Sequence, residues 1–94
     1  MLAALERHAA ELKQLSVVEI GLFGSWASGK PHRGSDVDIL VEFAPGAATV
    51  DNFFGVQFLL ERCLHRRVDL VIKSAVKPAL RQHILESTRY VAID

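Results

Sequence analysis

The chain has little cysteine and no long apolar run, and these two absences narrow the classes of protein to which it can belong. A single cysteine, Cys63, excludes an internal disulfide framework and a zinc site built from several cysteines. No segment reaches the roughly 18 to 20 apolar residues that span a bilayer. The first residues also lack the charged start and apolar stretch of a secretory signal. We therefore expect a cytoplasmic protein that contacts no membrane.

An excess of charge of one sign is also missing. Lys and Arg together number 11, as do Asp and Glu, so the formal net charge is +0. Proteins that coat nucleic acids usually have a clear basic excess, so the composition argues against direct nucleic-acid binding. Hydrophobic residues make up 50% of the 94 residues. A chain of this length and composition predicts a single globular domain, residues 1–94, with one modest core.

The spacing of apolar residues predicts alternating helices and strands. Helices are expected over residues 2–15, over about 52–65 with Thr49 or Asp51 as the cap, and from Pro78 onward. Strands are expected over 17–23, 37–43, 68–72 and 90–93. Strands separated by helices indicate an α/β (α+β) fold, in which helices pack against one small mixed β-sheet.

Three aspartates lie in or beside the expected strands. Side chains alternate along a strand, so Asp36 and Asp38 should face the same side of the sheet. Asp69 lies in the next apolar run and is expected to be their neighbour in space. Carboxylates repel one another unless a cation lies between them, and their hard oxygens suit Mg²⁺. The pattern therefore predicts a catalytic site in which the three aspartates hold two Mg²⁺ ions.

A glycine-serine pair precedes the aspartates and is suited to bind phosphate. Gly24 permits a close approach of the backbone, and the amides after it, with the Ser25 hydroxyl, can cradle nucleotide phosphates. Lys30 and Arg33 follow in a polar loop and can add positive charge. We expect these four residues to bind a nucleoside triphosphate.

The order of these motifs resembles that of the minimal nucleotidyltransferases of the DNA polymerase β superfamily. The resemblance covers about residues 17–91 and implies the nucleotidyltransferase fold. It also implies a role for each motif residue. Gly24 and Ser25 would bind the nucleotide phosphates, and Asp36 and Asp38 would each bind both metal ions. Asp69 would bind the catalytic metal ion beside the acceptor hydroxyl.

The resemblance further implies a reaction and a partner. Short members of this group are commonly encoded beside a HEPN-domain protein and act as its antitoxin, several by transferring AMP from ATP to a tyrosine of that toxin. A Mg²⁺-dependent protein adenylyltransferase with ATP as donor is therefore expected. Two alternatives stay open: an antitoxin that neutralises its toxin by binding alone, and a nucleotidyltransferase of small molecules such as aminoglycosides. Small-molecule members generally carry an additional domain that shapes the acceptor pocket.

Two further groups of residues allow more than one interpretation. Several basic residues lie near the expected third strand, and we interpret them as solvated surface charges in preference to a binding patch: Arg62, His65, Arg66, Arg67, Lys73, Lys77 and Arg81. Phe53, Phe54 and Phe58 fall on two sides of one helix. Core packing is the default for them, but any that are exposed would indicate an interface in a homo- or hetero-oligomer.

Overall fold

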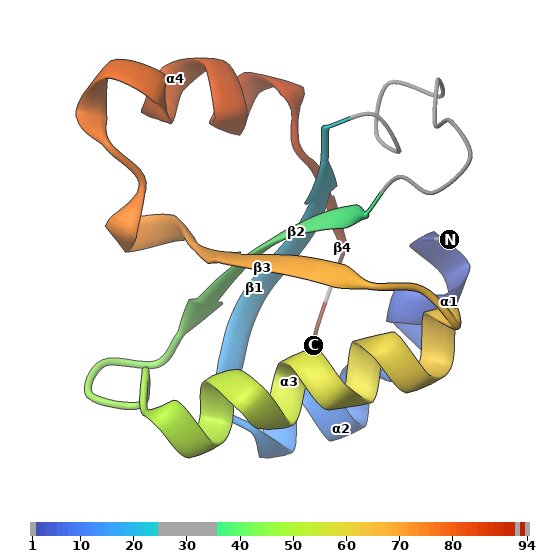
Figure 1. The fold of residues 1–94 in the computed structure, drawn as a ribbon. Coiled ribbons are helices and arrows are strands. Elements are labelled where there is room, and N and C mark those ends of the chain that lie inside the picture. Colours follow the sequence, from blue (N-terminus) through green and yellow to red (C-terminus); the bar gives the residue numbers. More distant parts are fainter. Residues whose placement is uncertain (1, 25–35, 92, 94) are drawn as a thin grey trace.

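Helices pack around a small sheet in this computed structural model, which describes residues 2–24, 36–91 and 93 (Figure 1). The elements are α1 (Leu2–Arg7), α2 (Ala9–Gln14), β1 (Val17–Phe23), β2 (Val37–Phe43), α3 (Val50–Leu64), β3 (Val68–Ile72), the 3₁₀ helix η1 (Lys73–Ala75), α4 (Pro78–Ser87) and β4 (Arg89–Val91). The predicted bounds of the first three strands are confirmed. No helix among the described residues is long and apolar enough to cross a membrane.

The described strands form one mixed sheet in the order β3-β2-β1-β4. Strand β1 is antiparallel to both of its neighbours, whereas β2 and β3 are parallel. Parallel strands need a long crossover connection, and α3 provides it. The predicted mixed sheet with packed helices is therefore confirmed, and β2 lies between β1 and β3.

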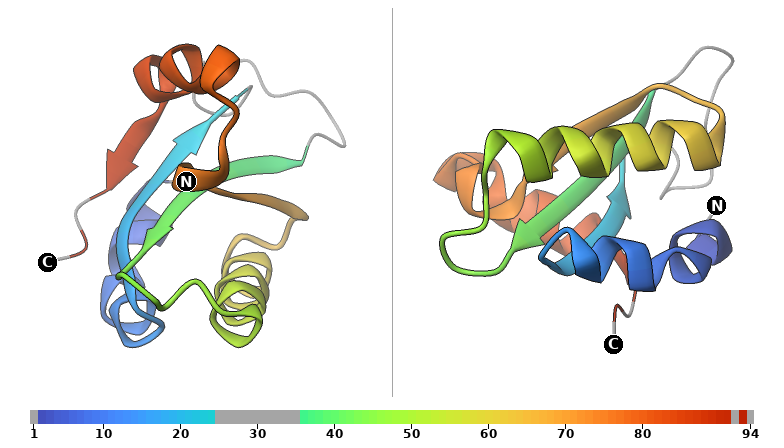
Figure 2. Two further views of the ribbon diagram at one scale, coloured as in Figure 1. Left: turned by 90° about the vertical axis from the view of Figure 1, so that its left-hand side faces the viewer. Right: turned by 90° about the horizontal axis from the view of Figure 1, so that it is seen from below.

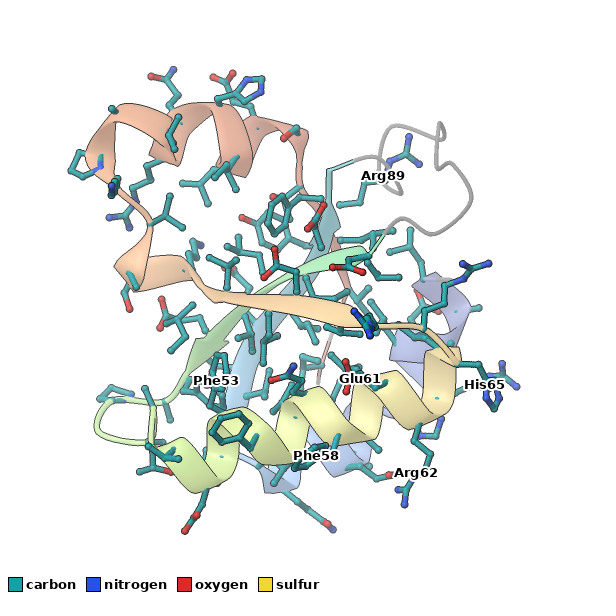
Figure 3. All side chains as sticks on the ribbon, in the orientation of Figure 1. Phe53, Phe58, Glu61, Arg62, His65 and Arg89 are labelled. Carbon is teal, nitrogen blue, oxygen red and sulfur yellow. The ribbon has the colours of Figure 1, made fainter. Side chains whose placement is uncertain are left out.

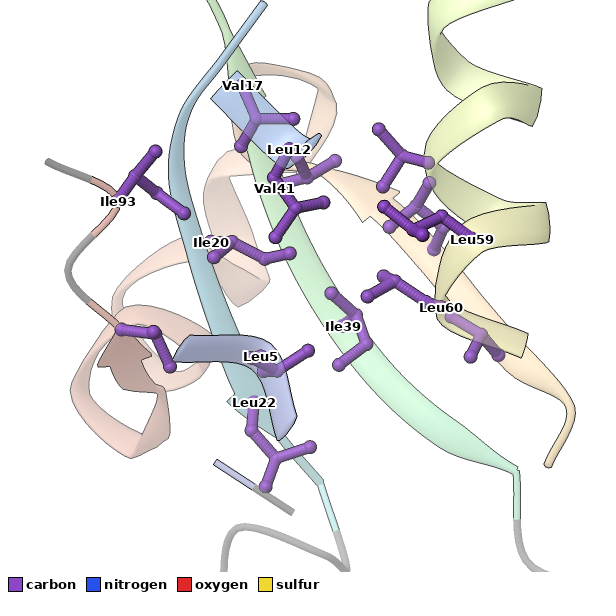
Figure 4. Packing of buried hydrophobic residues seen from close by; sticks show 14 of the residues in the cluster. Leu5, Leu12, Val17, Ile20, Leu22, Ile39, Val41, Leu59, Leu60 and Ile93 are labelled. Carbon is purple, nitrogen blue, oxygen red and sulfur yellow. The ribbon is translucent and has the colours of Figure 1, made fainter. Parts of the chain in front are cut away.

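The helices lie on both sides of this sheet. Helices α1, α2 and α3 cover one face, and α4 lies on the other side (Figures 1 and 2). The core fills the space between the first three helices and the sheet. Figure 4 shows side chains from the helices packed against side chains from the strands: Leu5, Leu12, Leu59 and Leu60 against Val17, Ile20, Leu22, Ile39 and Val41.

Alternation along β2 sorts its side chains between the two faces. Val37, Ile39 and Val41 are completely buried in the core, as predicted. Asp38 and Glu42 point to the opposite face, which we call the α4 face, and both are half-buried. The α4 face therefore carries the polar side chains of the central strand.

The ends of several elements differ from the prediction. The expected single N-terminal helix is wrong, because α1 ends at Arg7 and α2 begins at Ala9. A break of one residue leaves the spacing of Leu5 and Leu12 intact, so apolar periodicity does not reveal it. The last strand runs from 89 to 91 instead of from 90 to 93.

The structure shows which of the two candidate residues, Thr49 or Asp51, caps the start of α3. The Thr49 hydroxyl accepts a hydrogen bond from the Asn52 amide at 3.2 Å, so Thr49 is the cap and Asp51 lies in the first turn. This bond satisfies one of the amides that have no partner within a helix at its first turn.

The residue that follows the end of helix α3 has a strained backbone. His65 adopts the left-handed conformation, with φ 54° and ψ 37°, where a Cβ atom is disfavoured. We expect His65→Gly to raise the free energy of unfolding by about 1 kcal/mol, measured by urea denaturation. His65→Ala is the control because it keeps the Cβ atom. Equal stabilisation by both variants would instead assign the effect to loss of the imidazole.

Candidate active site

The site begins with two aspartates that are direct partners in the sheet. Asp38 of β2 pairs with Asp69 of β3 in the parallel ladder, and with Phe23 of β1 on its other side. Paired residues on adjacent strands point to the same face, and adjacent strands lie about 4.8 Å apart. The structure therefore brings these two predicted carboxylates together on the α4 face.

The third predicted carboxylate lies at the start of the same strand. Asp36 is exposed and precedes β2, whose first amide, that of Val37, donates a hydrogen bond to the Arg67 carbonyl at 2.9 Å. This bond fixes the start of β2 beside the start of β3. Asp36 is therefore held at the end of the sheet at which Asp38 and Asp69 meet.

The charges of these carboxylates act on one another. Burial raises the pKa of Asp38, and the negative charges of Asp69 and Asp36 raise it further. A hydrogen bond between the Asp38 and Asp69 side chains adds to the same increase in the pKa. An elevated carboxyl pKa with like-charged neighbours is typical of functional sites, because folding alone would not select the repulsion.

Gly24 lies directly against this cluster. It follows the last residue of β1 and has φ +73°, a conformation that favours glycine. A Cβ atom built on Gly24 would lie 2.2 Å from Oδ2 of Asp38, which is far inside contact distance. The absence of a side chain at this position thus lets the backbone approach the carboxylates. The expected phosphate-binding notch and the aspartates meet at one place.

The remaining predicted nucleotide-binding residues, Ser25, Lys30 and Arg33, lie outside the described residues, as does the helical turn expected after Gly24. Their roles stay predictions.

The carboxylates have the donor chemistry that Mg²⁺ prefers, although their present spacing is not that of a formed metal site. Among the described residues, no three His, Cys, Asp or Glu side chains are grouped closely enough to hold one metal ion. Asp36, Asp38 and Asp69 nevertheless supply only hard oxygens. Burial and the repulsion by the other two carboxylates raise the pKa of Asp38. A bound cation would relieve that repulsion, so these residues fit the ion that the sequence predicts.

The burial of Asp38 and its repulsion by the other carboxylates predict a variant that is more stable than the natural protein. Because the folded state raises the pKa of Asp38, its contribution to stability is present at low pH and is lost as the pH rises through that pKa. At pH 7 in EDTA, we expect Asp38→Asn to melt about 2–5 °C higher, with the difference shrinking toward pH 4. Glu6→Gln, at an exposed site on α1, is the control for removing one negative charge. A melting temperature of Asp38→Asn at or below that of the natural protein would contradict this expectation.

A second polar cluster on the α4 face was not found from the sequence. Lys73 forms an ion pair with Glu19, and its Nζ lies 5.4 Å from the centroid of the Tyr90 ring. The hydrogen bond to Glu19 raises the pKa of Lys73. A shift of register between Val17 and Glu19 turns these two residues to opposite faces, which regular alternation would not predict. Lys73 is therefore not the solvated charge that the sequence favoured, because it connects η1 to β1 across the sheet.

Known proteins with similar sequences and folds bear on what the site does. Residues 5–91 match the family model described as "Nucleotidyltransferase domain". The chain is 40% identical over 88 residues to the protein adenylyltransferase MntA of Thermococcus cleftensis, an alignment that covers 93% of this chain and 88% of the relative.

Solved structures give the same fold. A candidate minimal nucleotidyltransferase superposes with a TM-score of 0.77 at 29% identity, covering 94% of this chain and 93% of the other. A toxin-antitoxin complex with AMP-PNP contains a chain that superposes with a TM-score of 0.70 at 27% identity, covering 90% of this chain and 70% of that one. The nucleotidyltransferase fold predicted from the motifs is therefore confirmed.

Proposed function

The chain belongs to the nucleotidyltransferase domain family, and from this premise we propose that it is a protein adenylyltransferase that acts as the antitoxin of a HEPN-domain toxin. The donor is ATP, and the acceptor is a hydroxyl of the toxin, which the resemblance described above suggests is a tyrosine. Support for AMP transfer to a protein comes from the relative of 40% identity, a protein adenylyltransferase. Support for the antitoxin role comes from the likeness to a toxin-antitoxin complex with AMP-PNP.

The proposal rests on one structural observation, the clustering of three carboxylates beside Gly24. Asp38 and Asp69 are partners on adjacent strands, Asp36 is close enough to raise the pKa of Asp38, and Gly24 brings the backbone of β1 against the same carboxylate. This arrangement supports catalysis by carboxylates beside a backbone segment that binds phosphate. It does not depend on Ser25, Lys30 or Arg33, to which the proposal assigns auxiliary contacts with the phosphates.

The reaction proposed is an in-line displacement at the α-phosphorus of ATP. The acceptor oxygen forms a bond to the α-phosphorus, the bond from that phosphorus to the bridging oxygen breaks, and pyrophosphate leaves. Asp69 takes up the acceptor proton, and Gly24 and Ser25 hold the departing phosphates. When bound to Asp36, Asp38 and Asp69, Mg²⁺ would neutralise negative charge on the phosphates.

A labelling experiment tests this proposal. The purified chain is incubated with its HEPN-domain toxin and each α-labelled nucleoside triphosphate in turn, with Mg²⁺ or with EDTA. We expect Mg²⁺-dependent transfer from ATP and a mass gain on the toxin equal to one or more AMP units. Peptide mapping then identifies the modified hydroxyl.

The other outcomes identify the two alternatives. Stable binding and neutralisation of the toxin without any gain in mass would support an antitoxin that acts by binding alone. Transfer of label to an aminoglycoside, but not to the toxin, would support a small-molecule enzyme. Asp36→Asn provides the control, because loss of the label in this variant assigns transfer to the carboxylates and not to a contaminant.

A further inference from the structure

Helix α3 presents an apolar stripe that the other described residues leave uncovered. Val50 is 70% exposed, Phe54 46% and Phe58 66%, and these residues follow one another at intervals of one turn. The two phenylalanine rings stack, with centroids 6.2 Å apart and planes inclined by 28°. Figure 3 shows Phe58 on the side of α3 that points away from the sheet. Large exposed apolar groups gathered in this way are typical of a protein interface.

A groove runs beside this stripe, between α2 and α3. Its volume is about 400 Å³. Phe58 of the stripe forms part of its apolar lining together with Leu15, Gly55 and Leu59, and Glu11, Gln14 and Arg62 also line it. Glycine inside a helix costs about 1 kcal/mol relative to alanine. A Cβ atom on Gly55 would lie 3.1 Å from a methyl group of Leu15, so this glycine lets the Leu15 side chain pack closely against α3 at the bottom of the groove.

The stripe and the groove are complementary to each other. If two α3 helices pack antiparallel about a twofold axis, one register places Phe58 of each copy opposite Gly55 of the other. The same register places Asp51 in the first turn opposite Arg62 in the last turn, and both side chains are exposed. Each Phe58 ring therefore faces Gly55 of the other copy near the twofold axis. At each end of the contact, Asp51 of one copy faces Arg62 of the other.

We propose that this surface binds a second copy of the chain, so that the protein is a twofold dimer through α3. Phe58 of each copy occupies the groove of the other, and the Asp51 and Arg62 side chains form ion pairs across the axis. The formal net charge of +0 leaves no long-range repulsion between copies. The aspartates lie on the α4 face. Helices α3 and α4 lie on opposite sides of the sheet (Figure 2), so both active sites stay open in the dimer.

The first test is the mass of the chain in solution, measured by light scattering and sedimentation at several concentrations. We expect a concentration-dependent dimer and expect Phe58→Glu to weaken dimerisation at least about 30-fold. The variant should keep the melting curve of the natural protein at concentrations low enough for both to be monomers, because this side chain is 66% exposed. Leu80→Glu, at a site on α4 that is 55% exposed, is the matched control and should leave the dimer unchanged.

The second test addresses the register. Arg62→Asp and Asp51→Arg should each weaken the dimer about 3- to 10-fold, and the double variant should restore it. A monomer up to about 200 μM would overturn the proposal, and so would a dimer insensitive to Phe58→Glu. Failure of the double variant to restore dimerisation would overturn the antiparallel arrangement. A monomer that binds another protein through Phe58 would assign the surface to that partner instead.

Discussion

Asp69→Asn is expected to lower the rate of AMP transfer by about 10³-fold or more while leaving the fold intact. Asparagine has nearly the same shape as aspartate, and Asp69 is exposed on β3, so no packing is lost. The change removes the negative charge and the proton acceptor that the proposed reaction requires. The measurement is the initial rate of mass gain on the toxin at saturating ATP and Mg²⁺.

The same variant separates catalysis from toxin binding. Asp51→Asn, which removes a carboxylate from α3 on the opposite side of the sheet, is the matched control and should retain full transfer. Binding of the toxin by Asp69→Asn should stay within about twofold of the natural protein, because one exposed carboxylate contributes little to a protein interface. If transfer by Asp69→Asn stays within tenfold of the natural rate, Asp69 does not act at the reacting centre.

Gly24→Ala is expected to lower AMP transfer by about 100-fold or more and to lower the free energy of unfolding by about 2–3 kcal/mol. Two effects add at this position. The positive φ disfavours any Cβ atom by about 1–2 kcal/mol, and that atom would meet the Asp38 carboxylate. Either the aspartate or the end of β1 must move, and a displacement of the catalytic groups by 1 Å can cost about 10²-fold in rate.

Gly46 provides the control that separates these two effects. Its φ is +78°, close to that of Gly24, but a Cβ atom built there meets no described atom within 4 Å. Gly46→Ala should therefore show the cost of the backbone conformation alone and should retain full transfer. Equal losses of stability in the two variants would mean that the collision with Asp38 is relieved at no cost.

Much of the site could be read from the sequence because its aspartates lie in runs of regular alternation. The apolar residues around Asp38 and Asp69 fix which face of each strand is buried, and the carboxylates must then point the other way. The pairing of the two residues could not be read, because register depends on the packing of α3 against the sheet. The sequence predicts that Asp69 is a neighbour of the aspartate pair, and the structure shows that its direct partner is Asp38.

The features that the sequence did not reveal share a physical origin in local irregularity. The shift of register after Val17 turns Glu19 toward Lys73, and the break at His8 divides the first helix. Each changes the backbone over one or two residues without altering the average spacing of apolar residues. Periodicity detects faces and elements, but it does not detect such local changes.

The parallel pairing of β2 with β3 also has a consequence for how the protein acquires activity. Asp38 and Asp69 are separated in the chain by the whole of α3, so no local contact brings them together. Their meeting requires closure of the crossover, which carries an entropic cost and belongs to the slow, long-range events of folding. During synthesis the proposed active site cannot assemble before β3 has left the ribosome. In a refolding experiment, AMP transfer should therefore return with the long-range sheet contacts and not with the earlier recovery of helix.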